Sequence, residues 1–277
     1  MGTQQIRVAK LSAGFWRASF DHPPINLIDH DTVAELAALL TRIEQDPQLR
    51  VIVFESADPD FFLAHYDVLA ASTPFSLPPG PTGLHPWLDV LVRLSRAPVI
   101  SIALIRGRAR GAGSELALAC DLRFASLERA LLGQFEVTVG AVPGGGPMAR
   151  LARLVGRARA LEIVAGGHDF PAELAERYGY VNRALPDDQL DAFVDGFAER
   201  LARFDKRAIA EIKSHVDSVT LPSDEELSTG LDAFYASVRR PETQARVAAL
   251  LQGGLQKRSE LELDLGEKAD ALLSPDA

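Results

Sequence analysis

The chain begins with two short runs in which apolar and polar residues alternate. These runs, residues 6–11 and 15–20, are separated by Ala13-Gly14. Alternation is typical of a strand with one buried face, and a break at glycine is typical of a turn between two strands. We therefore expect a hairpin at this end of the chain.

The next segments predict a helix and then a fully covered strand. Thr32-Val33-Ala34-Glu35 has the form of a capping box that opens a helix. Residues 51–54 are apolar without alternation, as in a strand that is covered on both faces. The apolar face of the predicted helix consists of Val33, Leu36, Leu40 and Ile43.

Strands and helices then alternate along the middle of the chain. Residues 72–86 are rich in proline and glycine and predict a surface loop, which a short helix over 87–96 follows. A buried strand over 99–105, an apolar helix ending near Cys120 and a strand over 122–125 come next. This order predicts repeated ββα units in an α/β domain.

From about Pro147 the pattern becomes almost wholly helical, with one expected strand at 181–185. The expected helices cover 147–154, 157–165, 171–178 and 187–204, and further amphipathic segments follow. We divide the chain into a core (1–204), a helical C-terminal subdomain (205–257) and a charged tail (258–277) that is either helical or disordered.

Composition narrows the class of protein. The only cysteine, Cys120, lies in an apolar run, so an intrachain disulfide is excluded and a buried, inert thiol is expected. No segment has the apolar length of a signal peptide or a membrane span. The net charge of −9 argues against nucleic-acid or anionic-membrane partners. We expect a soluble, cytoplasmic protein.

Two segments have the small-residue or apolar character of a main-chain binding site. Gly111-Ala112-Gly113 lies between a buried strand and an apolar helix, where amide N–H groups and the helix dipole can hold an anion. Residues 61–67 follow another strand and could present a second amide beside the first. Taken alone, the first segment could equally serve chain geometry, and the second could be an ordinary loop.

Two carboxylates accompany these segments. Glu115 lies in the first turn of the helix, and Glu136 precedes the glycine-rich stretch 140–146. Paired carboxylates can hold a water molecule and exchange its proton. The alternative for Glu115 is a carboxylate that complements the helix dipole, and for Glu136 a solvated strand residue.

Together, these segments resemble the crotonase family, also called the enoyl-CoA hydratase/isomerase family. The family's Phe-x-x-Gly-Ala-Asp is similar to residues 62–67, and its Gly-x-x-x-Gly-Gly-Gly-x-Glu-Leu-Ala with a following Cys-Asp is similar to 107–121. Its Gly-Gln-Pro-Glu and the glycine cluster that follows resemble 133–150, with Phe135 in place of the proline. The resemblance covers nearly the whole chain except the charged tail.

The resemblance implies a crotonase-type spiral of ββα units with a helical C-terminal subdomain, commonly assembled as a homotrimer or homohexamer. It implies that the amides of Tyr66 and Ala112 form an oxyanion hole for an acyl-CoA thioester. In hydratases of the family the glutamates matching Glu115 and Glu136 cooperate on water, whereas in isomerases the one matching Glu136 is commonly the base. Coenzyme A enters as part of the substrate, and no other cofactor is implied.

The sequence departs from the family pattern at three places. His65-Tyr66 replaces Gly-Ala, Arg110 replaces a small or apolar residue, and Ala112 replaces the middle glycine. His65 could act on the substrate or pack away from it, and for Arg110 we favour an internal pair with Asp67 or Glu115. The histidines have no metal-ligand spacing. The residues expected to contact the substrate are His22, Ala64, His65, Asp67, Arg110 and Gly111.

Both glutamates are present, which favours an acyl-CoA hydratase acting on a 2-enoyl-CoA or catalysing the reverse dehydration. The first alternative is another crotonase reaction, namely isomerisation, decarboxylation, hydrolysis or carbon–carbon cleavage, which the departures at His65, Tyr66 and Arg110 suggest. The second is a non-catalytic crotonase-fold subunit that binds a partner protein through its helical C-terminus.

Overall fold

The structure, a computed structural model, describes residues 4–70 and 77–273. The described strands form two sheets. The larger sheet has the order β1 (Ile6–Ser12), β2 (Phe15–Phe20), β3 (Val51–Ser56), β5 (Ile100–Ile105), β7 (Leu122–Ser126) and β10 (Arg183–Leu185). The smaller has the order β4 (Phe61–Leu63), β6 (Arg108–Arg110), β8 (Leu131–Gly133) and β9 (Asp169–Pro171).

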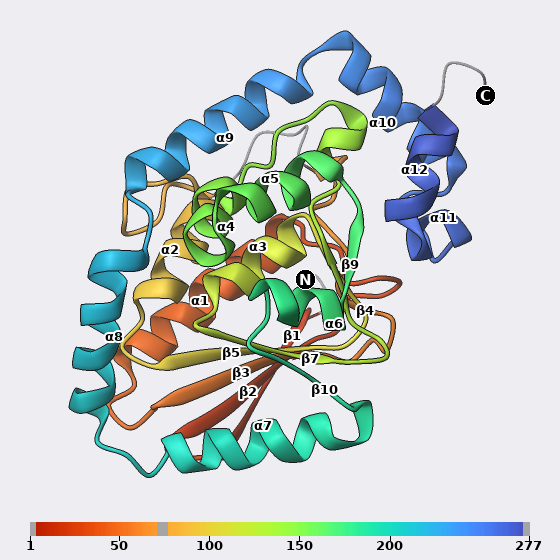
Figure 1. Ribbon diagram of the computed structural model, residues 1–277. Helices are drawn as coiled ribbons and strands as arrows, with labels where there is room; N and C mark the ends of the chain where they lie inside the picture. The colour runs from red at the N-terminus through yellow and green to blue at the C-terminus, as the bar shows by residue number, and fades with distance from the viewer. Residues whose placement is uncertain (1–3, 71–76, 274–277) are drawn as a thin grey trace.

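The chain winds as a spiral of ββα units (Figure 1). Both strands of the first unit, β1 and β2, belong to the larger sheet, whereas the later pairs β3–β4, β5–β6 and β7–β8 each place the first strand in the larger sheet and the second in the smaller one. The unit β3–β4 leads to α2 (Pro86–Arg96), and the unit β5–β6 leads to α3 (Ala112–Ala119). Corresponding strands of successive units pair in parallel. The predicted crotonase-type architecture is therefore confirmed.

The N-terminal hairpin is confirmed, since β1 and β2 pair antiparallel from Ile6–Phe20 onward. The start of the following helix, α1 (His30–Gln45), differs from the prediction. Its N-cap is Asp29, whose side chain accepts from the Thr32 amide, so the helix begins before the predicted capping box. Glu35 instead accepts hydrogen bonds from the Gln5 and Ile6 amides and fastens the helix to β1.

The larger sheet is covered on both faces, as its apolar strands predict. Figure 1 shows α7 (Asp187–Leu201) below the sheet and α1, α2 and α3 above it. Along β3, Val51 and Val53 pack with α7, whereas Ile52 and Phe54 belong to the core beneath the other helices. Alternate residues of one continuous apolar run thus fill two separate cores.

The four strands of the smaller sheet were not predicted. Each has only three residues, which is too short for a hydrophobic period to appear. The statement that 181–185 is the sole strand after Pro147 is wrong, because β9 precedes it. The helices on either side of β9 lie where expected. They are α4 (Pro147–Val155) and α5 (Arg157–Gly166) before the strand and α6 (Ala172–Tyr178) after it.

The C-terminal helices wrap around the outside of the molecule and return to it (Figure 1). They are α8 (Lys206–Thr220), α9 (Asp224–Val238), α10 (Pro241–Gly253), α11 (Glu260–Leu263) and α12 (Leu265–Leu273). Leu261 and Leu265 are buried in one cluster with Phe135 and Val139. The charged tail is thus helical over Glu260–Leu263 and Leu265–Leu273, while 274–277, like 72–76 of the predicted loop, lies outside the described residues.

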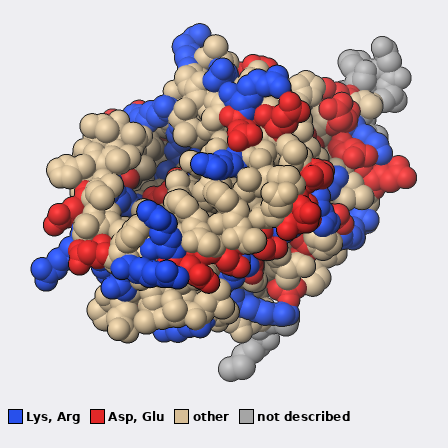
Figure 2. Space-filling view, turned by 60° about the horizontal axis from the view of Figure 1, so that its bottom comes forward, with Lys and Arg blue, Asp and Glu red and all other residues tan. Residues whose placement is uncertain are grey.

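The surface carries charges of both signs. Figure 2 shows Lys and Arg interspersed with Asp and Glu around uncharged side chains. Arg106, for example, pairs with Asp187 at 2.8 Å and with Asp191 at 2.9 Å. Within residues 4–70 and 77–273, every helix is too short or too polar to cross a lipid bilayer.

One close contact joins strand β4 to helix α3, which both carry parts of the site. A Cβ added at Gly113 of α3 would lie 2.2 Å from the Leu63 carbonyl oxygen of β4, so any side chain there would push helix and strand apart. Gly113→Ala should lower the free energy of unfolding by about 1–3 kcal/mol, measured by chemical denaturation.

Gly196→Ala is the matched control for this prediction. Gly196 is exposed in the interior of α7, and a Cβ added there meets nothing within 4 Å. The change should raise stability by about 0.5–1 kcal/mol through helix propensity. Equal destabilisation by both substitutions would contradict the steric explanation.

Candidate active site

A cavity of about 810 Å³ lies between the core and the C-terminal helices α9 and α10. The core side of its lining includes Tyr66, Ala112, Glu115 and Glu136. The helical side is mainly apolar and includes Leu231, Phe234, Val238, Val247 and Leu251. The cavity thus brings together residues that the sequence placed in three separate segments.

The turn before α3 has the geometry that its glycines suggest. Gly111 is the N-cap of the helix with φ +47°, a region that favours glycine, and its amide donates to the Gly133 carbonyl at 3.0 Å. Ala112 follows as the first helical residue, so its amide has no acceptor inside the helix. Among the described residues its N–H donates to no other acceptor.

The second predicted donor, Tyr66, is oriented by an isolated bridge to Ile28. Ile28 donates to the His65 carbonyl at 2.9 Å and accepts from the Asp67 amide at 2.8 Å. In a trans peptide the C=O and N–H point in opposite directions, so the Tyr66 N–H points away from Ile28. It too has no acceptor within the described part of the chain.

Glu115 is buried, and both of its carboxylate oxygens accept hydrogen bonds. The indole Nε1 of Trp87 donates to Oε2 at 2.9 Å, and the Gly145 amide donates to Oε1 at 2.6 Å. Burial raises the pKa of Glu115, and these two donors oppose that effect by stabilising the ionised form. Glu115 is therefore a buried, hydrogen-bonded carboxyl group rather than a surface group at a helix end.

Glu136 begins the short helix η2 (Glu136–Val139), and its carboxyl is turned inward. The residue as a whole is half-buried, but Oε2 is fully enclosed and has no hydrogen-bond partner among the described residues. Burial, together with the negative charge of Glu115, raises the pKa of Glu136 to about 8. Glu136 is therefore not the solvated strand residue that was one alternative.

The carboxyl of Glu136 also lies against the turn. A Cβ added at Gly111 would lie 2.9 Å from its Oε1. A Cβ added at Gly145 would lie 2.1 Å from Oε2 of Glu115. Both glycines are therefore needed to let the carboxylates approach the main chain.

His65 lines the cavity, but both of its ring nitrogens face protein groups. Nδ1 lies 2.8 Å from the Tyr66 carbonyl oxygen, and Nε2 lies 3.3 Å from Oε1 of Glu262 in α11. Burial alone would lower the pKa of His65, but the Glu262 carboxylate outweighs it and raises the pKa. His65 thus has hydrogen-bonding partners within the protein, and its action on the substrate stays a prediction.

Arg110 forms an internal ion pair, as favoured, but the two expected partners are wrong. Its buried guanidinium contacts Asp169 through Nε at 2.7 Å and Nη2 at 2.5 Å, rather than Asp67 or Glu115. Asp169 belongs to β9, a strand that the sequence did not predict, so this partner was invisible from sequence. Arg110 does not line the cavity.

Four other residues expected near the substrate, including Gly111, also lie outside the cavity lining. His22 directs Nδ1 toward the Leu27 carbonyl at 2.9 Å. Ala64 is buried, and its amide donates to Asn26. Asp67 accepts from the Leu69 amide and from the Gln256 side chain, each at 2.8 Å. Their contacts with substrate stay predictions.

Two partners of Glu115 were missed from sequence. Trp87 was expected only as the start of a helix, and Gly145 only as part of a glycine cluster. A tryptophan at the start of a helix after a long loop gives no sign of its distant acceptor, so no sequence signal could have identified it. The glycine cluster was a usable signal, because a glycine run beside paired carboxylates allows close main-chain approach.

Other chemistry is limited in the described residues. His, Cys, Asp and Glu side chains there form no group of three or more suited to a metal ion. Burial raises the pKa of the Cys120 thiol to about 12, which fits the expected inert thiol. The chemistry of the cavity therefore centres on the two carboxylates and the two amides.

Comparison with known proteins gives a consistent result. The family model for enoyl-CoA hydratase/isomerase matches residues 11–249. A Streptomyces avermitilis protein provisionally assigned as an enoyl-CoA hydratase is 43% identical, covers 97% of this chain and 96% of its own, and superposes with a TM-score of 0.90. An enoyl-CoA hydratase from Bacillus anthracis is 26% identical, with coverages of 90% and 97% and a TM-score of 0.72.

The raised pKa of Glu136 predicts a pH-dependent stability. The folded protein binds this proton more tightly than the unfolded chain, so the free energy of unfolding should fall as pH rises from about 5 to about 9. Glu136→Gln should remove about 4 kcal/mol of that fall. Chemical denaturation of both proteins across this range measures it, and parallel curves would show that Glu136 titrates normally.

Proposed function

Because this chain belongs to the enoyl-CoA hydratase/isomerase family, we propose that it adds water to a 2-enoyl-CoA thioester or catalyses the reverse dehydration. The observation that carries this proposal is the pair of inward-facing carboxylates, Glu115 and Glu136, in one cavity with two unpaired amides. Coenzyme A enters as part of the substrate, and no separate cofactor is proposed.

The amides of Tyr66 and Ala112 serve as the oxyanion hole. The thioester carbonyl oxygen accepts a hydrogen bond from each amide, and negative charge develops on that oxygen when a nucleophile adds to Cβ. Donors fixed by the protein stabilise this charge without having to reorganise. The helix that begins at Ala112 adds the positive end of its dipole beside the same oxygen.

The two glutamates take opposite roles in hydration. Glu115, whose ionised form Trp87 and Gly145 favour against the effect of burial, accepts a proton from water, and the hydroxide oxygen forms a bond to Cβ. Glu136, which holds its proton up to about pH 8, donates that proton to Cα as the enolate collapses. One O–H bond of water and the π bond between Cα and Cβ are broken, and one C–O and one C–H bond are formed. A proton then returns from Glu115 to Glu136.

The apolar helical wall supports an acyl group as the occupant of the far side of the cavity.

We also propose assembly into a homotrimer or homohexamer. Ile212, Val216 and Val219 lie on one face of α8 and remain exposed, which supports burial of that face against another subunit.

Glu115→Gln and Glu136→Gln should each lower kcat for hydration of crotonyl-CoA or longer 2-enoyl-CoA thioesters by roughly 10²- to 10⁴-fold, because each removes a proton-transfer group. Turnover is followed by loss of enoyl absorbance, with products identified by mass spectrometry. Glu173→Gln, in which an exposed glutamate of α6 is changed, is the control and should leave kcat unchanged.

Unaltered turnover in both active-site variants would refute the proposed roles. Absence of any acyl-CoA turnover in the wild type, together with absence of acyl-CoA binding by calorimetry, would instead support the non-catalytic alternative.

The pH dependence separates hydration from isomerisation. Hydration requires protonated Glu136, so kcat/KM should fall as pH rises through about 8. An isomerase that uses Glu136 as its only base requires the ionised form, so its rate would rise over the same range. Measuring kcat/KM from pH 6 to pH 10 with a 2-enoyl-CoA and a 3-enoyl-CoA therefore decides between the two reactions.

A further inference from the structure

We propose that Glu262, on the C-terminal helix α11, is a positioning residue that braces both halves of the oxyanion hole. The proposal rests on the function assigned above to the amides of Tyr66 and Ala112. It gives a role to the two sequence departures that the hydration mechanism does not use, His65 and Arg110.

The first contact is through the side chain of Glu262. This carboxylate is fully buried and lies 3.3 Å from Nε2 of His65, while Nδ1 of the same ring lies 2.8 Å from the Tyr66 carbonyl oxygen. The imidazole thus connects α11 to the peptide on the C-terminal side of Tyr66. The peptide on the N-terminal side is fixed by Ile28.

The contact requires a charged imidazolium. A carbonyl oxygen and a carboxylate are both acceptors, so each ring nitrogen of His65 must carry a proton to satisfy them. The charged groups that face the ring are Glu262 of α11, which favours the imidazolium, and Arg110 of β6, which opposes it. Glu262 also accepts from the Gln256 amide at 2.8 Å, which fixes its orientation.

The second contact is through the main chain of the same residue. The carbonyl oxygen of Glu262 accepts from Nη1 of Arg110 at 2.6 Å, and that of Leu263 accepts from Nη2 at 3.1 Å. Arg110 directly precedes Gly111 and Ala112, which form the other half of the hole. Glu262 therefore contacts both sides of the hole: its side chain contacts His65, which follows β4, and its main chain contacts Arg110, at the end of β6.

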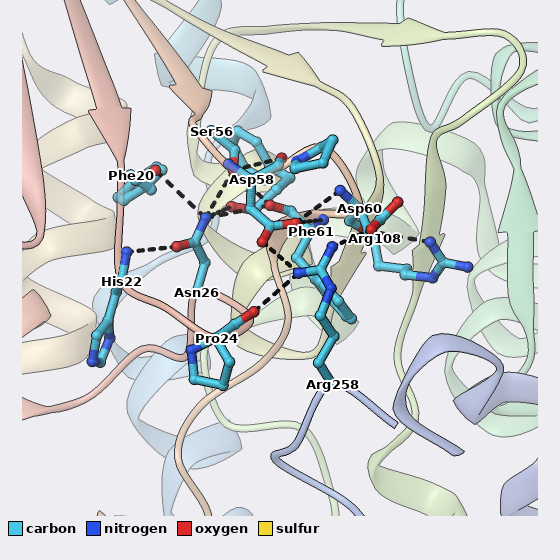
Figure 3. A network of polar contacts seen from close by, with 12 residues as sticks. Phe20, His22, Pro24, Asn26, Ser56, Asp58, Asp60, Phe61, Arg108 and Arg258 are labelled. Carbon is cyan, nitrogen blue, oxygen red and sulfur yellow. Dashed lines mark hydrogen bonds and ion pairs between the residues drawn. The ribbon is translucent and has the colours of Figure 1, made fainter. Parts of the chain in front are cut away.

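Further contacts hold this segment against the core. Arg258 donates to the Pro24 carbonyl at 3.1 Å and pairs with Asp58 at 2.6 Å and with Asp60, as Figure 3 shows. Arg108 donates to the Leu263 carbonyl at 2.8 Å. The segment thus contacts the turn before β4 as well as β6, so its docking is tied to the same two strands.

The test is Glu262→Gln, with Glu260→Gln as the matched control. Glu260 lies on the same helix, but its side chain is 92% exposed. Glu262→Gln removes the charge that keeps His65 protonated, so kcat for hydration should fall roughly 10- to 100-fold through misplacement of the Tyr66 amide, with KM changing less than about threefold. Glu260→Gln should match the wild type.

A readout independent of turnover isolates the hole itself. Butyryl-CoA with ¹³C at its thioester carbonyl has no double bond to hydrate, and its C=O stretching band moves to lower frequency when the oxygen accepts hydrogen bonds. Infrared difference spectra should show this shift in the wild type and in Glu260→Gln, and a smaller shift in Glu262→Gln. An undiminished shift in folded Glu262→Gln would overturn the proposal.

If Glu262→Gln fails to fold, His65→Gln/Glu262→Gln replaces it. This double variant leaves neither buried charge unpaired and should fold, yet it should show the same reduced carbonyl shift; a wild-type shift would overturn the proposal. The proposed hydratase function would fail differently. In that case the wild-type band would still shift on binding, while no 2-enoyl-CoA would be hydrated.

Discussion

The contact between α3 and β4 at Gly113 is the constraint on which the site depends. The helix and the strand meet with no room for a side chain. This close approach brings the free amide at the start of the helix to the cavity that also contains Tyr66, a few residues after the strand. It also directs the first turn of the helix, with Glu115, into the same space. The contact at Gly113 thus positions both a backbone donor and a carboxylate of the site.

The cavity also holds two carboxyl groups whose negative charges repel each other. Neither has a cation within hydrogen-bonding distance among the described residues, and burial raises the pKa of both. Because two buried like charges are costly, the pair retains one proton at neutral pH. The hydrogen bonds of the two groups are unequal, since Trp87 and Gly145 donate only to Glu115 and favour its ionised form.

Sequence predicted the long elements, the spiral order of units and the carboxylates, because periodicity and motif spacing are local properties. It did not predict the strands of the smaller sheet, which have too few residues to show a period. It also could not assign partners to His65 and Arg110. Glu262 lies 197 positions from His65, and Asp169 lies 59 positions from Arg110. Such pairings arise from tertiary packing and leave no local pattern.

The position of α11 along the chain has a consequence for biosynthesis. During translation the strands and helices of the spiral emerge first, and the segment that carries Glu262 emerges after them. A nascent chain can therefore complete its sheets and bury most of its core while His65 and Arg110 still lack their shared partner. The contacts of His65 and Arg110 with Glu262 then form only after the spiral is in place, when α11 docks on it.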